Sequence, residues 1–521
     1  MIENNILSLS LALAAVMVVL AGKSTFAEAA PAENYTNEVT GNDSWWSPDD
    51  GRILPDYLEI PNAYGRLGII NAAGPIDTAN HPFFKAMGSN GRACVTCHQP
   101  SDGMSLSVET IQQRWEQTDG KDPLFAAIDG SNCPNLDQDD KASHSLLLEK
   151  GLIRVALPWP PLPYDGEPVK PEFSIEVVKD PTGCNVDPVW GVKGEKSVVS
   201  VFRRPRPVIN VNHLVELPSG VPPHDKFFFN DKSLLPKDPE TGEFVSLQLM
   251  ADGRGLSPRH QANDAALNHL ERRAPLTEEQ LSKIEGFELG LNVAQAFDNA
   301  GGDLTSPDSP PGLGPQSLLD ADKGMLGNNP VNKIFGDFSM WRHADETTLT
   351  SQQAFQQSVA RGAEVFYSKR FFIRDVGAYN DKGIGNPFKR SCGSGCHNTT
   401  AMGMDLAPGF MDLGLNNWPW QKSRSDLPLF KVTCDASAVP QSYLGRTIYT
   451  HDPGRALITG KCADVGATMT QQMRALAARP PYFANGSADS LREVIDLYDR
   501  RFNIGYSDQE KSDLINFLRT L

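Results

Sequence analysis

The sequence lacks an excess of basic residues, because its 48 Lys and Arg are outnumbered by 64 Asp and Glu and its formal net charge is −16. It also lacks any run of like charges. An acidic chain repels nucleic-acid phosphates and anionic lipid headgroups, so we expect neither nucleic acid nor an anionic membrane surface as a partner. A small basic or neutral protein is a more suitable partner for the negative electrostatic field of this chain.

Long hydrophobic runs are also scarce. The one long run covers residues 6–22, and the small residues within 25–29 could hold a cleavage site. Residues 1–30 are therefore predicted to be a secretory signal peptide. The first five residues contain no Lys or Arg, which departs from the usual pattern, and an uncleaved membrane anchor is the alternative. We expect a periplasmic or secreted protein with no membrane span after signal cleavage.

Cysteine is used sparingly, with eight residues in 521. Four of them belong to two short motifs, and the remaining four are Cys133, Cys184, Cys434 and Cys462. An even remainder in an oxidising compartment predicts two disulfides. The order along the chain favours Cys133–Cys184 and Cys434–Cys462, while other pairings or buried thiols stay open.

The first motif is Cys94-Val-Thr-Cys97-His98, the C-x-x-C-H signature of covalent haem attachment. Two thiols add to the haem vinyl groups, and the adjoining His becomes the axial ligand of the iron. A structural zinc site would need a second Cys/His pair nearby, which the sequence does not contain. A thioredoxin-like reading of the motif lacks its βαβ context.

The second motif, Cys392-Gly-Ser-Gly-Cys396-His397, has three residues between its cysteines instead of two. Its two glycines would let the extra residue bulge outward without strain. A disulfide or a haem with a single thioether is the alternative. We therefore predict two covalently bound c-type haems, with His98 and His397 as iron ligands.

The predicted fold class is mainly α with few short strands. Helix-start signals occur at 257–258, 277–280 and 507–510, and the second helix is expected to continue to about Phe297. Apolar residues at helical spacing over 491–498 predict a further helix with one buried stripe. The 39 prolines and 44 glycines indicate long irregular loops between these elements.

Three further segments carry a resemblance to a known family. Asp252-Gly253-Arg254 is followed by Gln261 and, ten residues later, by Glu271. Residues 479–487 read Arg-Pro-Pro-Tyr-Phe-Ala-Asn-Gly-Ser, and a last helix is expected over 507–521. In this order, beside two haem motifs, they resemble the bacterial dihaem cytochrome c peroxidase superfamily, which includes the MauG enzymes of methylamine utilisation.

The resemblance implies two cytochrome c-like domains, each with one haem. We expect the N-terminal haem domain at 31–300, a connector at 301–340 and the C-terminal haem domain at 341–521. In that family the first haem reacts with peroxide, and the second stores or relays electrons.

Gln261 and Glu271 match the Gln and Glu that line the distal side of the peroxide-reacting haem in that family. Cleavage of a peroxide O–O bond needs a base for the proton of the near oxygen and an acid for the leaving oxygen, and one carboxylate can do both. The resemblance therefore makes Glu271 the acid/base and Gln261 its hydrogen-bonding neighbour. The alternative is that both are polar residues on a solvated helix face.

Tyr498 lies twelve residues after Gly486, where the peroxidases carry a Met ligand of the second haem and the MauG enzymes a Tyr ligand. A phenolate stabilises ferric and higher-valent iron relative to a thioether. The resemblance therefore implies Tyr498 as the second axial ligand. The alternative is a core tyrosine on the buried stripe of 491–498.

Several residues depart from the family pattern. Ala251 stands where the family has a Trp between its haems, and Trp341, Trp418 or Trp420 could substitute from elsewhere. Ala484 replaces a His of that family.

Arg479 and Arg204 replace residues that help the family hold a calcium ion, so a calcium site is doubtful. No counterpart of the peroxidases' distal-His segment follows His98, and we therefore expect an open first haem at rest.

The resemblance implies a peroxide-dependent oxidoreductase that passes electrons between two haems. Its electron donor or substrate would be a small periplasmic redox protein, an oxidisable protein or an organic compound. Two alternatives stay open: a dihaem oxygenase that acts on an organic substrate with dioxygen, and a non-catalytic electron-transfer cytochrome.

Overall fold

The structure is a computed structural model that describes residues 45–162, 169–215, 249–320, 337–377, 386–397, 410–417 and 424–521. The predicted signal peptide and the candidate residues Trp418 and Trp420 lie outside these ranges. Among the helices described, none is both long and apolar enough to span a bilayer.

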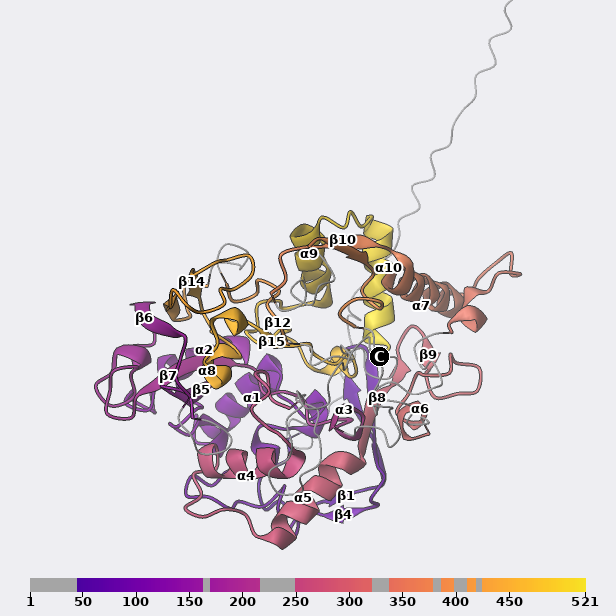
Figure 1. The fold of residues 1–521 in the computed structure, drawn as a ribbon. Coiled ribbons are helices and arrows are strands. Elements are labelled where there is room, and N and C mark those ends of the chain that lie inside the picture. Colours follow the sequence, from indigo (N-terminus) through magenta and orange to yellow (C-terminus); the bar gives the residue numbers. More distant parts are fainter. Residues whose placement is uncertain are drawn as a thin grey trace, which may run out of the picture. The chain divides into compact units, whose positions relative to one another are not determined.

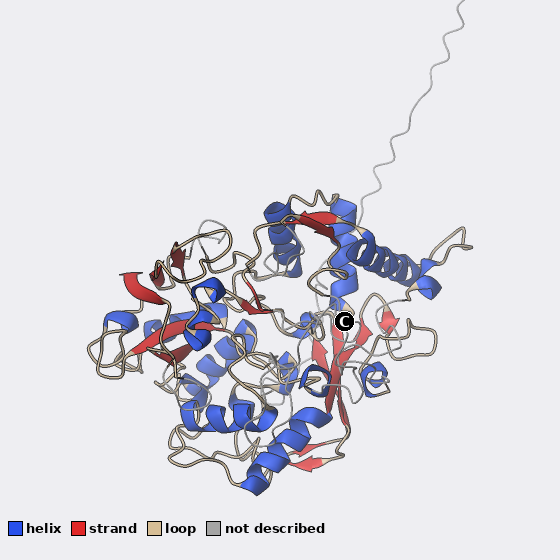
Figure 2. Cartoon of the chain, in the orientation of Figure 1, coloured by secondary structure: helices blue, strands red, loops and turns tan. Residues whose placement is uncertain are grey.

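The fold is mixed, and the prediction of a mainly α class is wrong. Of the residues described, 31% are helical and 19% are in strands, and the strands form several small antiparallel sheets between the helices (Figure 2). Some missed strands, such as Phe173–Lys179, pair with a strand that lies far along the chain, here Leu429–Cys434, and local periodicity carries no signal of such a pairing.

The helices that the structure describes share their labels with Figure 1. They are α1 (Val108–Thr118), α2 (Ser145–Lys150), α3 (Asn212–Val215), α4 (Pro258–Asn268), α5 (Glu278–Gly290), α6 (Gln316–Leu319), α7 (Ser351–Ser368), α8 (Ala456–Thr459), α9 (Leu491–Phe502) and α10 (Asp508–Arg519). The predicted starts of α4, α5, α9 and α10 are confirmed. Ser257 caps α4, while Thr277 with Gln280 and Ser507 with Glu510 form capping boxes on α5 and α10.

The strands are short and antiparallel. They are β1 (Ile53–Leu54), β2 (Tyr57–Asn62), β3 (Gly65–Asn71), β4 (Ile76–Asp77), β5 (Ile153–Pro158), β6 (Phe173–Lys179), β7 (Val198–Arg203), β8 (Leu291–Asp298), β9 (Gly302–Asp303), β10 (Phe371–Ile373), β11 (Phe388–Arg390), β12 (Phe410–Met411), β13 (Leu429–Cys434), β14 (Thr447–Thr450) and β15 (Thr468–Met469).

The largest sheet described has the strand order β2-β3-β8-β9. One of its strands occupies residues that were predicted to belong to a helix. The helix that starts at Thr277 was expected to reach Phe297, but α5 ends at Gly290 and β8 begins at once. Strand β8 pairs with β3 along its length, and nearly all of its residues are buried. A continuous buried strand has no alternating pattern that would distinguish it from a buried helix.

A second sheet joins distant parts of the sequence, in the order β14-β13-β6. Val177 and Ile175 of β6 pair with Phe430 and Val432 of β13, and these apolar residues belong to one hydrophobic cluster. The domain boundaries inferred from the sequence stay a prediction, but β6 and β13 come from the two proposed haem domains.

Both predicted disulfides are confirmed. Cys133 is bonded to Cys184, and Cys434 at the end of β13 is bonded to Cys462. Cys94, Cys97, Cys392 and Cys396 take part in no disulfide.

Helices α7 and α10 lie side by side (Figure 1), and their buried residues belong to the hydrophobic cluster that packs against Cys392 of the second Cys-His motif. Their close approach depends on Gly362, because an added Cβ would lie 2.0 Å from the backbone carbonyl oxygen of Asp513. The Arg361 guanidinium donates to the Asp513 carboxylate at 2.8 Å, and Ser358 donates to the same group at 2.5 Å. The contact therefore combines close packing with a largely buried polar network.

Candidate functional site

The first cavity contains the first Cys-His motif. Cys94, Cys97 and His98 line it, and its empty volume, with the space open to solvent, is about 1290 Å³. The motif begins as a single 3-10 turn over Cys94–Thr96, which brings the two sulfur-bearing residues and the imidazole to one wall. Burial raises the pKa of the Cys97 thiol to about 12, so this thiol is protonated when nothing is bonded to it.

The ring of His98 is held in one tautomer. Its Nδ1 lies 3.0 Å from the carbonyl oxygen of Met104, so that Nδ1 donates and Nε2 keeps its lone pair. Burial lowers the pKa of His98 to about 4, and the ring is neutral at pH 7. A neutral, oriented imidazole is the form that ligates a metal.

Helix α4 forms another wall of the first cavity. Gln261, Ala265 and His269 line it at intervals of four residues, which places them on one face of the helix. The structure therefore places Gln261, which the sequence had singled out, in the lining of the cavity that also contains His98.

Glu271 lies elsewhere. Helix α4 ends at Asn268, and Glu271 follows in a left-handed conformation with φ of 53°. Its side chain is exposed and does not line the first cavity. The structure thus does not bring Gln261 and Glu271 together in that cavity, and the role of Glu271 stays a prediction.

The second cavity contains the second Cys-His motif and has an empty volume of about 1520 Å³, with the space open to solvent. Cys392, Cys396, His397 and Tyr498 all line it. Burial, and then the neighbouring Cys396 and Cys392 thiols, raise the pKa of Tyr498. The structure therefore brings Tyr498 to the predicted motif.

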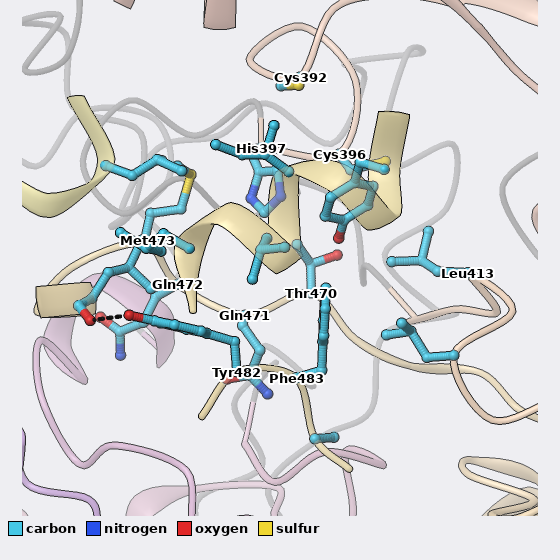
Figure 3. Close-up of a pocket in the computed structure, with 18 of the residues that line it drawn as sticks. Cys392, Cys396, His397, Leu413, Thr470, Gln471, Gln472, Met473, Tyr482 and Phe483 are labelled. Carbon is cyan, nitrogen blue, oxygen red and sulfur yellow. Dashed lines mark hydrogen bonds between the residues drawn. The ribbon is translucent and has the colours of Figure 1, made fainter. Parts of the chain in front are cut away.

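Figure 3 shows how the labelled residues enclose this second cavity. His397 and Cys396 lie on one side, and Gln471, Tyr482 and Phe483 lie on the opposite side. The Tyr482 hydroxyl donates to the carbonyl of Leu476 at 2.9 Å.

Sequence reasoning missed two candidate ligands in the second cavity. Met473 is 5% exposed and lines the cavity, and its thioether is a haem-iron ligand in other cytochromes. Tyr506 also lines it, and its hydroxyl lies 3.6 Å from the sulfur of Cys392. Met473 falls in an irregular segment with no helical or strand period, so no pattern in the sequence singled it out.

The two cavities share part of their lining. The shared residues are Arg204, Pro205, Arg206, Pro207 and Gln472. No aromatic side chain is among them in the part of the chain that the structure describes. Trp341 lines neither cavity, is 1% exposed, and donates from its indole Nε1 to the carbonyl of Asp308 at 3.3 Å.

Positive charge gathers around the shared residues. Burial, and then repulsion by Arg479, lower the pKa of Arg204 to about 9 and that of Arg206 to about 10. Arg204 donates to the backbone carbonyl of Arg479 at 2.8 Å, and Arg206 donates to that of Met250 at 3.2 Å. Within the described residues neither guanidinium forms an ion pair. Partly buried cations with neutral partners are suited to an anionic ligand.

The Asp-Gly-Arg segment is structural in this chain. Asp252 is fully buried and bonds Arg203 at 2.5 Å and Arg254 at 2.9 Å, while Arg203 also bonds Asp452. Gly253 adopts φ of 71°, and an added Cβ would lie 2.2 Å from the ring of Phe410. The segment thus ties the first cavity's wall to residues far along the chain.

Comparisons with known proteins add little. No protein-family model matches the sequence, and no curated protein matches it. One solved structure that matches is that of a MauG-like protein associated with microbial copper homeostasis, with 16% sequence identity and a TM-score of 0.25. The match covers 56% of this chain and 79% of that chain. A likeness this low carries no conclusion about family or function.

In the described residues, no group of three or more His, Cys, Asp and Glu side chains could hold a metal ion by itself. The first cavity instead presents the His98 imidazole beside two thiols, in addition to the imidazole of His269, and the second presents the His397 imidazole beside two thiols. In a c-type haem two such thiols bond the porphyrin and the imidazole ligates the iron, so these side chains fit that group.

Proposed function

We propose that this chain is a dihaem c-type cytochrome that reacts with hydrogen peroxide at its first cavity. One observation carries the proposal. Each cavity is lined by two cysteines and the histidine that directly follows them, while the other four cysteines are bonded to one another. In an oxidising compartment most cysteines would otherwise be paired in disulfides.

The residues of both cavities fit a covalently held haem. Cys94 and Cys97 would form the thioethers of the first haem, with His98 Nε2 on its iron. Cys392, Cys396 and His397 would serve the second haem in the same way. The Arg204 and Arg206 guanidiniums, which border both cavities, would neutralise haem carboxylates.

When bound, the haem supplies the redox chemistry, and the chain supplies position, exclusion of water and proton transfer. Gln261 would hold the peroxide by hydrogen bonding from helix α4. The electrons would come from a small redox protein, or from an oxidisable protein or organic substrate. The acidic chain would attract a basic donor protein.

The proposed compartment is the periplasm. The two disulfides support an oxidising compartment, where such bonds form and persist. Covalent haem attachment in the same compartment would use the four cysteines that remain.

Mass spectrometry of the mature protein tests the proposal directly. We expect two covalently bound haem groups, one of which is lost in the variant Cys94→Ala/Cys97→Ala and the other in Cys392→Ala/Cys396→Ala. A mature protein with fewer than two haems would contradict the dihaem assignment.

The reaction itself is tested by mixing the diferric protein with hydrogen peroxide and following the haem spectrum. We expect a rapid change at the first haem. No change together with two low-spin haems would indicate an electron carrier, and a stable oxygen adduct of the isolated protein would indicate an oxygenase.

A further inference from the structure

His269 stands at the C-terminal end of α4 and lines the first cavity. It lies eight residues after Gln261, slightly more than two helical turns, and Ala265 lies between them on the same face. Helix α4 therefore presents one amide and one imidazole to the cavity that holds His98. No sequence pattern singled out His269, because its partner lies far away along the chain.

That partner is Asp129. The Nδ1 atom of His269 lies 2.6 Å from Oδ2 of Asp129, a carboxylate that is 4% exposed. A hydrogen bond to this carboxylate makes Nδ1 the donor and leaves Nε2 as the ring nitrogen that can act in the cavity. The imidazole is thereby fixed in both orientation and tautomer.

Asp129 is itself held by Arg92, which is 1% exposed and also lines the first cavity. Arg92 donates to Asp129 and, from its other nitrogens, to the carbonyls of Pro123 and Leu124 at 2.6 Å each. Although burial opposes its ionisation, the Arg92 cation and His269 keep the pKa of Asp129 below its usual value. Asp129 therefore stays ionised and orients His269.

The other acidic candidates suit proton transfer less well. Glu271 is exposed and lies off the lining of the first cavity. Glu288 lines the cavity, but burial raises its pKa to about 8, so it is mostly protonated at pH 7 and cannot readily accept a proton. Glu288 is the one carboxyl group among the described lining residues of this cavity, which leaves His269 as the oriented base.

We propose that His269 Nε2 is the proton-transfer group of the first cavity, an inference that rests on the proposed function. It accepts the proton of the near oxygen of hydrogen peroxide and donates it to the far oxygen, which leaves as water when the O–O bond breaks. Complete reduction of the peroxide takes two electrons and two protons and gives two waters. The two electrons would come from the small redox protein, oxidisable protein or organic substrate proposed above as the donor, by way of the haem when it is bound. Asp129 acts as a positioning residue.

The variant His269→Gln of the dihaem protein tests the assignment. We expect the reaction of the diferric protein with peroxide to slow by about 10²–10⁴-fold, the loss typical of a missing general acid/base, at unchanged haem content. Hydrogen cyanide must also lose its proton to bind iron, so cyanide association should slow in the same variant. That second measurement involves no turnover.

A matched control is His343→Gln. His343 also pairs with a carboxylate, since its Nδ1 lies 3.2 Å from Glu346, but it lines neither cavity. We expect its peroxide and cyanide rates to equal those of the unmodified protein. Asp129→Asn keeps His269 but changes the partner of its Nδ1, and should slow both reactions less than His269→Gln does.

Two outcomes would overturn the assignment: wild-type rates in His269→Gln, or a large loss in Glu271→Gln alone. Failure of the proposed function looks different, because the unmodified protein would then lack the first haem or would not react with peroxide at all. If His269→Gln does not fold, Asp129→Asn decides, and unchanged peroxide and cyanide rates in it would contradict the inference.

Discussion

At the scale of single residues, the second cavity offers more than one side chain that could ligate the iron of the proposed second haem. Tyr498, Met473 and Tyr506 all line it together with His397. Burial raises the pKa of Tyr498, so its hydroxyl is protonated unless ferric iron displaces the proton. The resemblance pointed to Tyr498, and the structure adds a thioether that the sequence pattern did not reveal.

We predict that Tyr498→Phe changes the spectrum of the second haem and raises its reduction potential, because a phenolate stabilises ferric iron. Met473→Leu, a substitution of similar volume, should leave both unchanged. Redox titration of the two variants checks this. The reverse result, a lowered potential in Met473→Leu with Tyr498→Phe unchanged, would assign the thioether as the ligand.

Glu288 gives a prediction about pH. Burial raises its pKa to about 8 in the folded protein, well above the ordinary value of a glutamate. Between these two values the unfolded chain has lost the proton that the folded chain keeps, so the group's contribution to stability falls as pH rises to about 8. Glu288→Gln should remove this fall, which thermal unfolding between pH 5 and 9 measures. An identical pH dependence in both proteins would show that Glu288 ionises normally.

At the scale of elements, sequence signals located helix starts well. The capping residues of α4, α5 and α10 and the apolar stripe of α9 all act at short range, and the structure confirms them. The junction of α5 and β8 could not be predicted in this way. Strand β8 depends on pairing with β3, which lies far earlier in the chain.

Helix packing gives a prediction at the same scale. Gly362→Ala would force its new methyl group into the backbone of α10, and we expect the free energy of unfolding to drop by about 1–3 kcal/mol. Gly286→Ala is the matched control, because that helical glycine in α5 has nothing within 4 Å of an added Cβ. It should raise the free energy of unfolding by up to about 1 kcal/mol. Denaturant unfolding of both variants measures these changes, and equal stabilities would show that α7 and α10 can separate at no cost.

At the scale of the whole molecule, the sequence predicted residues that would bear the chemistry but not how they meet in space. The Cys-His motifs are contiguous, so they could be read directly. Gln472 and the segment 204–207 meet only through the tertiary fold, and they border both cavities. His269 and Asp129 likewise come from distant segments, so no local pattern could pair them.

The disulfides act at this scale as well. Cys133 and Cys184 lie 51 positions apart in the sequence and Cys434 and Cys462 lie 28 apart, so both bonds restrict the unfolded chain. Replacing either pair with alanines should lower the free energy of unfolding by about 2–5 kcal/mol. Calorimetry of each variant, with covalent haem content as the control, checks this. If a variant lost covalently bound haem but kept its stability, the disulfide-bonded cysteines would have been wrongly excluded from the haem sites.

Strand β6 has a consequence for how this protein is made. Its hydrogen-bonding partner and much of the apolar surface over it arrive only when residues 429–434 emerge. Before that moment the nascent polypeptide presents an open edge to any other extended segment, a known route to misassembly. Enzymes that attach a porphyrin to the first Cys-His motif would therefore meet a chain whose own hydrophobic interior is still incomplete.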